Sequence, residues 1–271
     1  MHARDAVRSP RFPREDTEIL LSAILGKPRT WILAHLEYVL TPAQEYQWDI
    51  FRKRREQGEP VAYITGEKEF FGRSFHVDHS VLIPRPSTEG LVEMALGFME
   101  QKSEIRNPKS EIQILDTGII GMCELWGSLG GIQTIVDIGT GSGCIAITLA
   151  CELPEMNVIA TDISAAALSI AKTNAKSHGV GERIQFLQGN LLEPVIDLKN
   201  PFLIIANPPY IPEGEELPLD LTVYEPSVAL RAGPDGLSVL RPLLAAAHTH
   251  PACRGYVIEC RTDQENALVN H

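Results

Sequence analysis

The stretch Leu203-Ile204-Ile205-Ala206-Asn207-Pro208-Pro209-Tyr210 decides the expected fold. Residues 202–206 form an unbroken apolar run of strand length, which is typical of a parallel strand buried on both faces. Pro208 and Pro209 cannot donate ladder hydrogen bonds, so the strand must end at Asn207. Open α/β sheets bind ligands at the carboxyl ends of their strands, so this abrupt end predicts a site. The same pattern also fits a polar cap and a proline turn with only a structural role.

A strand-to-helix junction lies upstream of this stretch. Residues 134–138 predict a strand, residues 139–143 read Gly-Thr-Gly-Ser-Gly, and residues 144–151 predict a helix. This order opens a doubly wound nucleotide-binding domain, because glycines let a ligand approach the backbone at a helix N-terminus. The next strand, 157–162, ends on Asp162 at the spacing where a carboxylate binds ribose hydroxyls. The alternative is that Asp162 only caps the following helix.

Two further strands complete the expected parallel sheet. Residues 184–188 predict a third strand, which is followed by Gly189-Asn190-Leu191, and residues 255–259 predict a fifth strand after the stretch quoted above. The fold class is therefore α/β, with a Rossmann-like arrangement of strands and helices.

Charge is distributed unevenly along the 271 residues, whose net charge is −11. Residues 1–90 hold 13 basic and 13 acidic side chains, which leaves 11 basic and 22 acidic ones in residues 91–271. Non-specific affinity for a nucleic-acid backbone comes largely from Lys and Arg, so the acidic part is poorly suited to it. A small ligand or a protein partner fits this charge better than direct nucleic-acid binding.

The five cysteines, at 123, 144, 151, 253 and 260, form no C-x-x-C pair and predict reduced thiols in a cytoplasmic protein. Neither they nor the eight histidines show a metal-ligand spacing, so we expect no metal. No apolar stretch has membrane-spanning length, and the N-terminus is too polar for a secretory signal.

The first third of the chain predicts smaller pieces. Residues 1–15 lack helical periodicity and predict a disordered lead-in. Residues 16–59 predict a helical domain, in which Thr41-Pro42-Ala43-Gln44 resembles a capping box. The basic run Arg52-Lys53-Arg54-Arg55 on its last helix is either a solvated face or a docking surface for an acidic or RNA-bearing partner.

The remaining sequence divides into a linker and the main domain. Residues 60–86 predict a linker with a hairpin, and residues 87–271 predict the main domain, which starts with an amphipathic helix capped by Ser87. Within it, residues 101–133 contain the near repeat Lys-Ser-Glu-Ile, and we expect an inserted mobile surface loop without catalytic content.

Taken together, the segments 60–66, 82–89, 136–147, 207–210 and 225–237 resemble the HemK/PrmC family. These are S-adenosylmethionine-dependent methyltransferases that modify the glutamine of the Gly-Gly-Gln motif in peptide chain release factors. The resemblance covers roughly residues 16–260. It implies a helical substrate-docking domain, a hairpin linker and a seven-strand class I methyltransferase domain.

The resemblance also implies roles for individual residues. Asn207 and Pro208 would accept the two N–H groups of the substrate carboxamide, and Tyr210 would pack on the amide plane, with Pro209 lining the substrate site. An amide nitrogen is a poor nucleophile, so most of the acceleration would come from positioning, by up to about 7–11 kcal/mol. The residues expected to hold the cofactor are Asp137, Gly139, Thr140, Gly141, Ser142, Gly143, Asp162, Asn190, Leu191 and Asn207.

The chain departs from the family at several positions. Ser87 replaces an acidic residue, Asn190 replaces an aspartate, and Cys260 replaces a glycine. The chain also ends before the antiparallel strands that would follow strand five, so the sheet is expected to be C-terminally truncated. Strand five would then lie at an open edge and promote self-association. The alternative is that part of residues 112–133 closes the sheet.

Three other functions fit parts of the sequence. An adenine amino-methyltransferase acting on DNA or RNA uses the same Asn-Pro-Pro-Tyr logic on a flipped base. A nicotinamide-dependent oxidoreductase would also have the glycine loop and Asp162, but would leave Asn207-Pro208-Pro209-Tyr210 unexplained. A non-catalytic binding protein is the third alternative.

Overall fold

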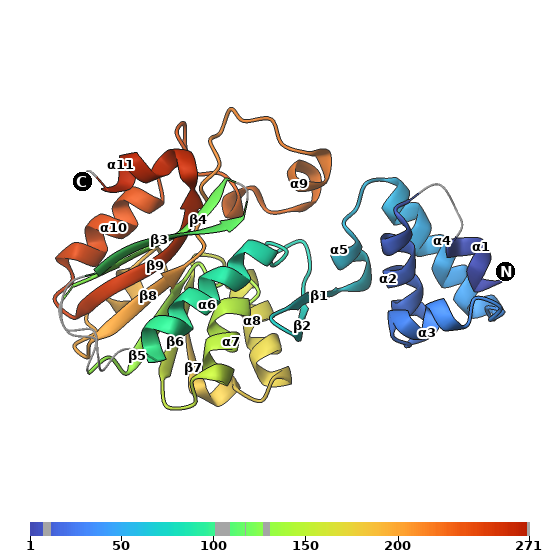
Figure 1. Ribbon diagram of the computed structural model, residues 1–271, viewed down its shortest axis with the longest axis horizontal. Coiled ribbons are helices and arrows are strands. Elements are labelled where there is room, and N and C mark those ends of the chain that lie inside the picture. The colour runs from blue at the N-terminus through green and yellow to red at the C-terminus, as the bar shows by residue number, and fades with distance from the viewer. Residues whose placement is uncertain (8–11, 101–108, 117, 127–130, 270–271) are drawn as a thin grey trace. The chain divides into compact units, whose positions relative to one another are not determined.

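The computed structural model describes residues 1–7, 12–100, 109–116, 118–126 and 131–269 (Figure 1). The chain divides into two compact units: Met1–Glu67 with Leu217–Tyr224, and Lys68–Glu216 with Glu225–His271. Within the described residues, no helix is both long and apolar enough to cross a membrane.

The smaller unit is helical. Its apolar core includes Leu20, Leu21, Ile32 and Trp48. The expected capping box is confirmed at Thr41, whose side chain accepts the Gln44 N–H while the Gln44 side chain accepts the Thr41 N–H. The helices are α1 (Ala3–Val7), α2 (Arg14–Leu25), α3 (Arg29–Ala34), α4 (Pro42–Glu56), α5 (Val61–Thr65) and α9 (Leu219–Tyr224).

The start of the chain differs from the disordered lead-in expected over residues 1–15. Helix α1 buries Ala3, Ala6 and Val7, and the Ala3 N–H donates to the Tyr38 carbonyl at 2.9 Å. One turn and a half of helix is too short to show periodicity in the sequence. Its burial against the other helices holds it.

The basic run on α4 is largely engaged within its own unit. Arg54 forms an ion pair with the buried Glu59 at 2.6 Å, and Arg55 forms one with Asp16 at 2.8 Å. Arg52 pairs with Glu56 one turn along the helix at 2.5 Å. Three of the four charges therefore have intramolecular partners, which weakens the interpretation of this run as a docking surface.

The larger unit is a seven-stranded sheet in the order β3-β4-β9-β8-β5-β6-β7. Strands β5 (Thr134–Ile138), β6 (Asn157–Asp162), β7 (Ile184–Gln188) and β8 (Phe202–Ala206) have the bounds expected from the sequence. Strand β9 (Cys253–Arg261) is longer than expected and pairs with β8 in parallel. The α/β class with a Rossmann-like sheet is confirmed.

Helices cover both faces of this sheet (Figure 1). Helices α6 (Pro86–Glu100) and α7 (Cys144–Glu152) share one core with Leu203 and Ile205 of β8. Helix α10 (Leu240–Thr249) shares the other core with Ile204. The alternation along β8 explains its continuous apolar sequence, since each face meets a different helical layer. The remaining helices are α8 (Ala165–Ser177) and α11 (Glu265–Val269), with single 3₁₀ turns at 181–183, 193–195, 227–229 and 262–264.

A small hairpin, β1 (Glu67–Phe70) with β2 (Arg73–His76), precedes α6, as expected. Asn174 of α8 anchors it: the His76 N–H donates to Asn174 Oδ1 at 2.8 Å, and Asn174 Nδ2 donates to the His76 carbonyl at 2.9 Å. Because the hairpin is held on α8, residues 80–85, which follow it, return to the sheet.

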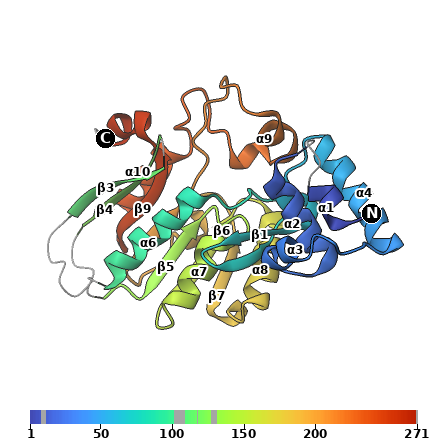
Figure 2. The same cartoon turned by 45° about the vertical axis from the view of Figure 1, so that its right-hand side comes forward.

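Strands β3 (Lys109–Asp116) and β4 (Ile119–Leu125) correct two expectations. Both lie in the segment expected to be a mobile inserted loop, and β4 pairs antiparallel with β9 along its whole length. Strand β9 therefore has β8 on one side and β4 on the other, and Figure 2 shows β4 and β3 beside it, so the open edge expected at 255–259 is wrong. The first part of the expected loop, 101–108, lies outside the described residues.

The physical reason for this closure is an apolar row on β4 that matches β9. Met122 and Ile120 are buried and face the core beneath α10, with Cys260 directly opposite Ile120. A short turn at Gly118 reverses the chain into the β3–β4 pair, so one hairpin adds two strands to the sheet. The sheet is thus not truncated.

Gly255→Ala should lower the free energy of unfolding by about 2–4 kcal/mol relative to the wild type. Gly255 has φ +150, and a Cβ there would lie 2.4 Å from the Glu124 carbonyl and 2.8 Å from Leu125 Cδ2 on β4. The measurement is urea denaturation followed by circular dichroism. The control, Gly97→Ala in α6, meets no atom within 4 Å and should be neutral or stabilising. Equal stabilities for the two variants would contradict the pairing of β4 with β9.

Candidate functional site

Strand β8 places Asn207 as the sequence predicts. All five strand residues are buried, and Ala206 lies opposite Ile138 of β5 and Ile258 of β9. Asn207 follows directly, and Pro208 and Pro209 prevent further pairing. Strand order reverses between β5 and β8, which is where such sheets form their ligand crevice.

The glycine loop begins where β5 ends and leads into α7. Gly143, its last residue, has φ +83 and precedes the first turn of the helix. A Cβ at Gly143 would lie 2.8 Å from Ile147 Cδ1 and 3.1 Å from Ala171 Cβ. Glycine is therefore required here for packing of the loop against α7 and α8 as well as for its backbone conformation.

Asp137, at the end of β5, supports the loop from below. Its Oδ2 accepts hydrogen bonds from the Thr140 hydroxyl at 2.6 Å and from the Ala146 N–H at 3.1 Å. Burial raises the pKa of Asp137 to about 7, against the opposing effect of these two donors. Its Oδ1 has no partner among the described residues, and neither has the buried Ser142 hydroxyl.

Asp162, at the end of β6, binds the loop from the other side. Its Oδ2 accepts the Gly141 N–H at 2.9 Å and its Oδ1 accepts the Ser164 N–H at 2.8 Å. Burial raises the pKa of Asp162, although these backbone donors favour its charged form. The following helix is capped by Ser164, whose side chain accepts the Ala167 N–H. Asp162 is thus left to order the loop and to line the pocket.

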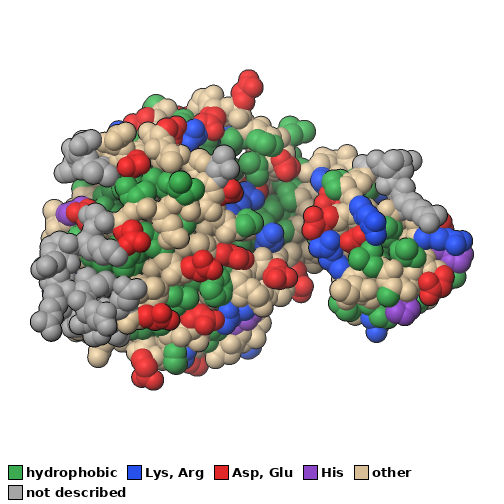
Figure 3. Space-filling view, in the orientation of Figure 1, with side chains coloured by type: hydrophobic (Ala, Val, Ile, Leu, Met, Phe, Trp, Pro, Cys, Tyr) green, Lys and Arg blue, Asp and Glu red, His purple; other side chains and the backbone are tan. Residues whose placement is uncertain are grey.

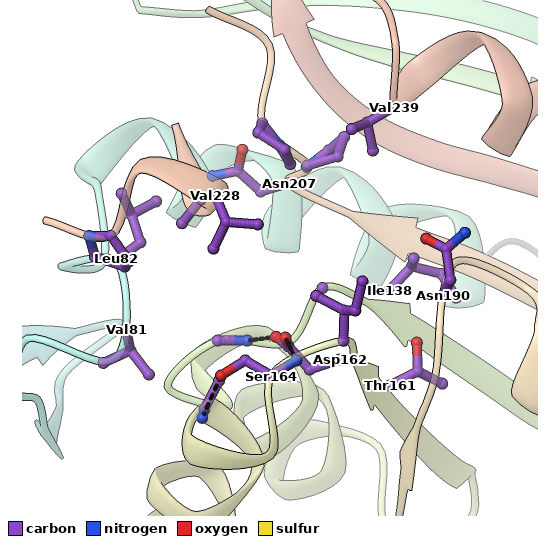
Figure 4. A pocket seen from close by; sticks show the side chains of 18 of the residues that line it. Val81, Leu82, Ile138, Thr161, Asp162, Ser164, Asn190, Asn207, Val228 and Val239 are labelled. Atoms are coloured by element: carbon purple, nitrogen blue, oxygen red, sulfur yellow. Dashed lines mark hydrogen bonds between the residues drawn. The ribbon is translucent and has the colours of Figure 1, made fainter. Parts of the chain in front are cut away.

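A cavity of about 190 Å³ lies between these elements (Figure 4). Figure 4 shows Asn207 and Asp162 on opposite sides of it. The predicted site residues that line the cavity are Gly139, Gly141, Asp162, Asn190, Leu191, Asn207, Pro208 and Pro209. The predicted residues that do not line it are Asp137, Thr140, Ser142, Gly143 and Tyr210. The first four of these lie in or beneath the loop.

Tyr210 is placed differently from the expected wall of the pocket. Its ring packs against the core cluster beneath α10, and its hydroxyl donates to Glu259 at 3.1 Å. Burial and the Glu259 carboxylate both raise the pKa of Tyr210, so the phenol stays a neutral donor.

Sequence reasoning missed two segments that line the cavity. Ser80, Val81 and Leu82 come from the connection after the hairpin, and Pro226, Val228 and Ala229 come from the segment before α10. An ion pair of 2.7 Å joins the two segments, between Arg85 and the buried Glu225. Apolar loop residues of this kind carry no spacing signal, so only tertiary structure could bring them to the site. Thr161 of β6, Ile163 and Val239 also line the cavity and were not predicted.

A hydrogen-bond chain continues from Asn207 into the protein. Asn207 Nδ2 donates to Thr88 Oγ1 at 2.8 Å, and Thr88 Oγ1 donates to Glu259 Oε2 at 2.9 Å. Ser87 Oγ also donates to Glu259, at 3.3 Å. Glu259 is fully buried in β9; burial raises its pKa, while the donors from Thr88, Tyr210 and Ser87 oppose that rise.

The charge of the pocket limits what it can bind. Among the described residues that line it, Asp162 is the only charged one, and no Lys or Arg is present. The Gly141 N–H, which a pyrophosphate would require, is already given to the Asp162 carboxylate. These features disfavour a phosphate-bearing ligand and suit one that carries positive charge. Figure 3 shows acidic side chains spread over the same unit.

Residues 2–66 match the family described as PrmC N-terminal domain, and residues 128–222 match the methyltransferase small domain. The release factor glutamine methyltransferase of Chlorobaculum tepidum is 40% identical over 240 residues, which cover 87% of this chain and 74% of that protein. The chain belongs to the release factor glutamine methyltransferase family. The HemK/PrmC resemblance is thereby confirmed.

Two other similarities differ in extent. A bifunctional methyltransferase of Rickettsia typhi is 41% identical over 230 residues, which cover 83% of this chain and 42% of that protein. The chain therefore spans about two fifths of the length of this relative. The solved N-terminal domain of human METTL16 has a TM-score of 0.43 and 17% identity, covering 74% of this chain and 65% of that one.

Asp137→Asn should gain stability relative to the wild type as pH rises from 5 to 8. The folded pKa of about 7 lies above the unfolded value of about 3.9, so the folded wild type binds more protons between these limits. Stability due to this group is present below pH 4 and is lost as pH rises through 7. Urea unfolding of both proteins at pH 5 and pH 8 measures the difference. If the difference in unfolding free energy between the two proteins were the same at both pH values, the raised pKa of Asp137 would be contradicted.

Proposed function

We propose that this chain transfers a methyl group from S-adenosylmethionine to the side-chain amide nitrogen of the glutamine in the Gly-Gly-Gln motif of a peptide chain release factor. The observation that carries the proposal is the orientation of Asn207. Its amide NH₂ is held by Thr88, and among the described residues its Oδ1 accepts no hydrogen bond. An acceptor at the pocket is what a carboxamide NH₂ requires.

The pocket residues fit the cofactor on their own chemistry. Asp162 would bind the ribose hydroxyls, Asn190 and Leu191 would lie along the adenine, and the loop at 139–143 would follow the methionine portion. Among the described residues that line the pocket, Asp162 is the only charged one and none is Lys or Arg, which suits a cationic sulfonium and ammonium. S-Adenosylmethionine supplies a methyl group on a positively charged sulfur, which is the leaving group.

The chain's own residues would then position the substrate amide. Asn207 Oδ1 and the Pro208 carbonyl would each accept one N–H, which directs the nitrogen lone pair at the methyl carbon. In the proposed transfer the amide nitrogen would form a bond to the methyl carbon as the S–C bond breaks, and the nitrogen would release one proton to water. Positioning of this kind lowers the barrier without a basic side chain in contact with the nitrogen.

The proposed partner is a protein, and no direct nucleic-acid or membrane contact is part of the proposal. A release factor acts at the ribosome, so we place the reaction in the cytoplasm, where it would support translation termination. The adenine-directed alternative would require a base and its phosphates to enter a site whose described lining residues include no Lys or Arg. The helical unit is proposed as the docking domain for the release factor.

Asn207→Ala should lower kcat for release-factor methylation by about 100-fold or more, while cofactor affinity stays within a few fold. Its contacts strengthen only as the amide nitrogen develops its lone pair. The assay is mass spectrometry of the peptide that contains the Gly-Gly-Gln motif. Asn200→Ala, at an exposed position, is the control. Retained kcat in Asn207→Ala, or no methylation by the wild type, would overturn the assignment.

Asp162→Ala should weaken S-adenosylmethionine binding by about 1–3 kcal/mol, the usual cost of losing hydrogen bonds to a charged group. Isothermal titration calorimetry measures the dissociation constant. Asp197→Ala removes a carboxylate with 98% side-chain exposure outside the pocket and should bind normally. Unchanged affinity in Asp162→Ala would contradict ribose binding at this position.

A further inference from the structure

Glu259 does not line the pocket, and neither do the three side chains whose hydroxyls converge on its carboxylate; one of them, Thr88, contacts Asn207, which does line it. Tyr210 and Ser87 approach Oε1 at 3.1 and 3.3 Å, and Thr88 approaches Oε2 at 2.9 Å. Glu259 and Thr88 are 0% and 2% exposed, so water cannot replace these partners. Burial raises the pKa of Glu259, and the three hydroxyl donors together with the positive charge of Arg85 oppose that rise by favouring the ionised form.

The number of hydroxyl protons determines the direction of the hydrogen bonds between Glu259, Thr88 and Asn207. Ser87, Thr88 and Tyr210 all donate to Glu259, the arrangement that an ionised carboxylate requires because it only accepts hydrogen bonds. Thr88 has a single hydroxyl proton, and after giving it to Glu259 it can only accept from Asn207. Asn207 must therefore turn its NH₂ toward Thr88, as the 2.8 Å contact shows, and its carbonyl oxygen away from Thr88.

We propose that Glu259 is a positioning residue for substrate recognition. Because it accepts the hydrogen bond of the Thr88 hydroxyl, Asn207 has to present its carbonyl oxygen to the substrate amide. This inference rests on the proposed function. If Glu259 were a neutral amide, Thr88 could accept from it and donate to Asn207 Oδ1. Asn207 would then present NH₂ to the NH₂ of glutamine, two donors that repel, and would match the carboxylate of a glutamate instead.

The direction of the hydrogen bonds from Asn207 through Thr88 to Glu259 therefore determines whether the site prefers glutamine or glutamate. The test compares the affinity of the enzyme, with S-adenosylhomocysteine bound, for the release factor and for the same factor with Gln→Glu in its Gly-Gly-Gln motif. Calorimetry gives the ratio of the two dissociation constants. A merely structural role for Glu259 would change both constants alike and leave this ratio unchanged.

The decisive variants are Thr88→Val and Thr88→Ser. Thr88→Val should reduce the preference for glutamine by about tenfold and lower kcat by a similar factor, because Asn207 loses the partner that fixes its orientation. Thr88→Ser keeps the hydroxyl and should restore both within about threefold. Glu259→Gln should act in the same direction as Thr88→Val if it folds. Cofactor affinity should remain within about twofold in all of them.

The matched control is Thr148→Val in α7, which removes a fully buried hydroxyl that has no hydrogen-bond partner in the described part of the chain. It should leave the preference unchanged. A Thr88→Val enzyme that folds and keeps the wild-type preference overturns the inference, even when the wild type methylates the release factor. A wild type that does not methylate glutamine overturns the proposed function itself, so the two failures are distinguishable.

Discussion

A strand that cannot be extended is the constraint on which this site depends. β8 is the middle strand of seven and is buried on both faces, and Pro208 offers no N–H to continue its ladders. Asn207 is therefore left at the carboxyl edge of the sheet. The glycine loop of β5 and Glu259 of β9 reach the same place because Ile138 and Ile258 lie in register with Ala206.

Buried carboxylates dominate the electrostatics around this edge. Asp137, Asp162 and Glu259 stand at or near the carboxyl ends of three strands, and burial raises the pKa of each. Charged groups in such positions cost stability unless their partners satisfy them. Here the partners are mostly backbone N–H groups and hydroxyls, so these acids orient the loop, Thr88 and Tyr210. The negative charge that remains suits a cationic cofactor.

Strands β3 and β4 show that the order of strands in the sheet can differ from their order in the sequence. The family resemblance implied that the antiparallel strands follow strand five, but in this chain β3 and β4 precede β5. The position where the family has glycine carries Cys260, whose sulfur lies 3.3 Å from Met122 of β4. A hairpin can occupy this position because antiparallel pairing needs only a short turn, and it extends the sheet without crossing another connection.

The sequence by itself determined strands β5, β6, β7 and β8, the glycine loop, the capping box of α4 and the end of β8 at Asn207. Each depends on local chemistry: an apolar run, a missing N–H or a residue's conformational freedom. Tertiary structure alone decided that strands β3 and β4 close the sheet, that Val81 and Val228 line the pocket, and that Tyr210 faces Glu259. Edge pairing and loop packing are decided by contacts between distant residues. The amide orientation of Asn207 likewise depends on Thr88 and Glu259, which lie 119 and 52 positions away in the chain but adjacent in space.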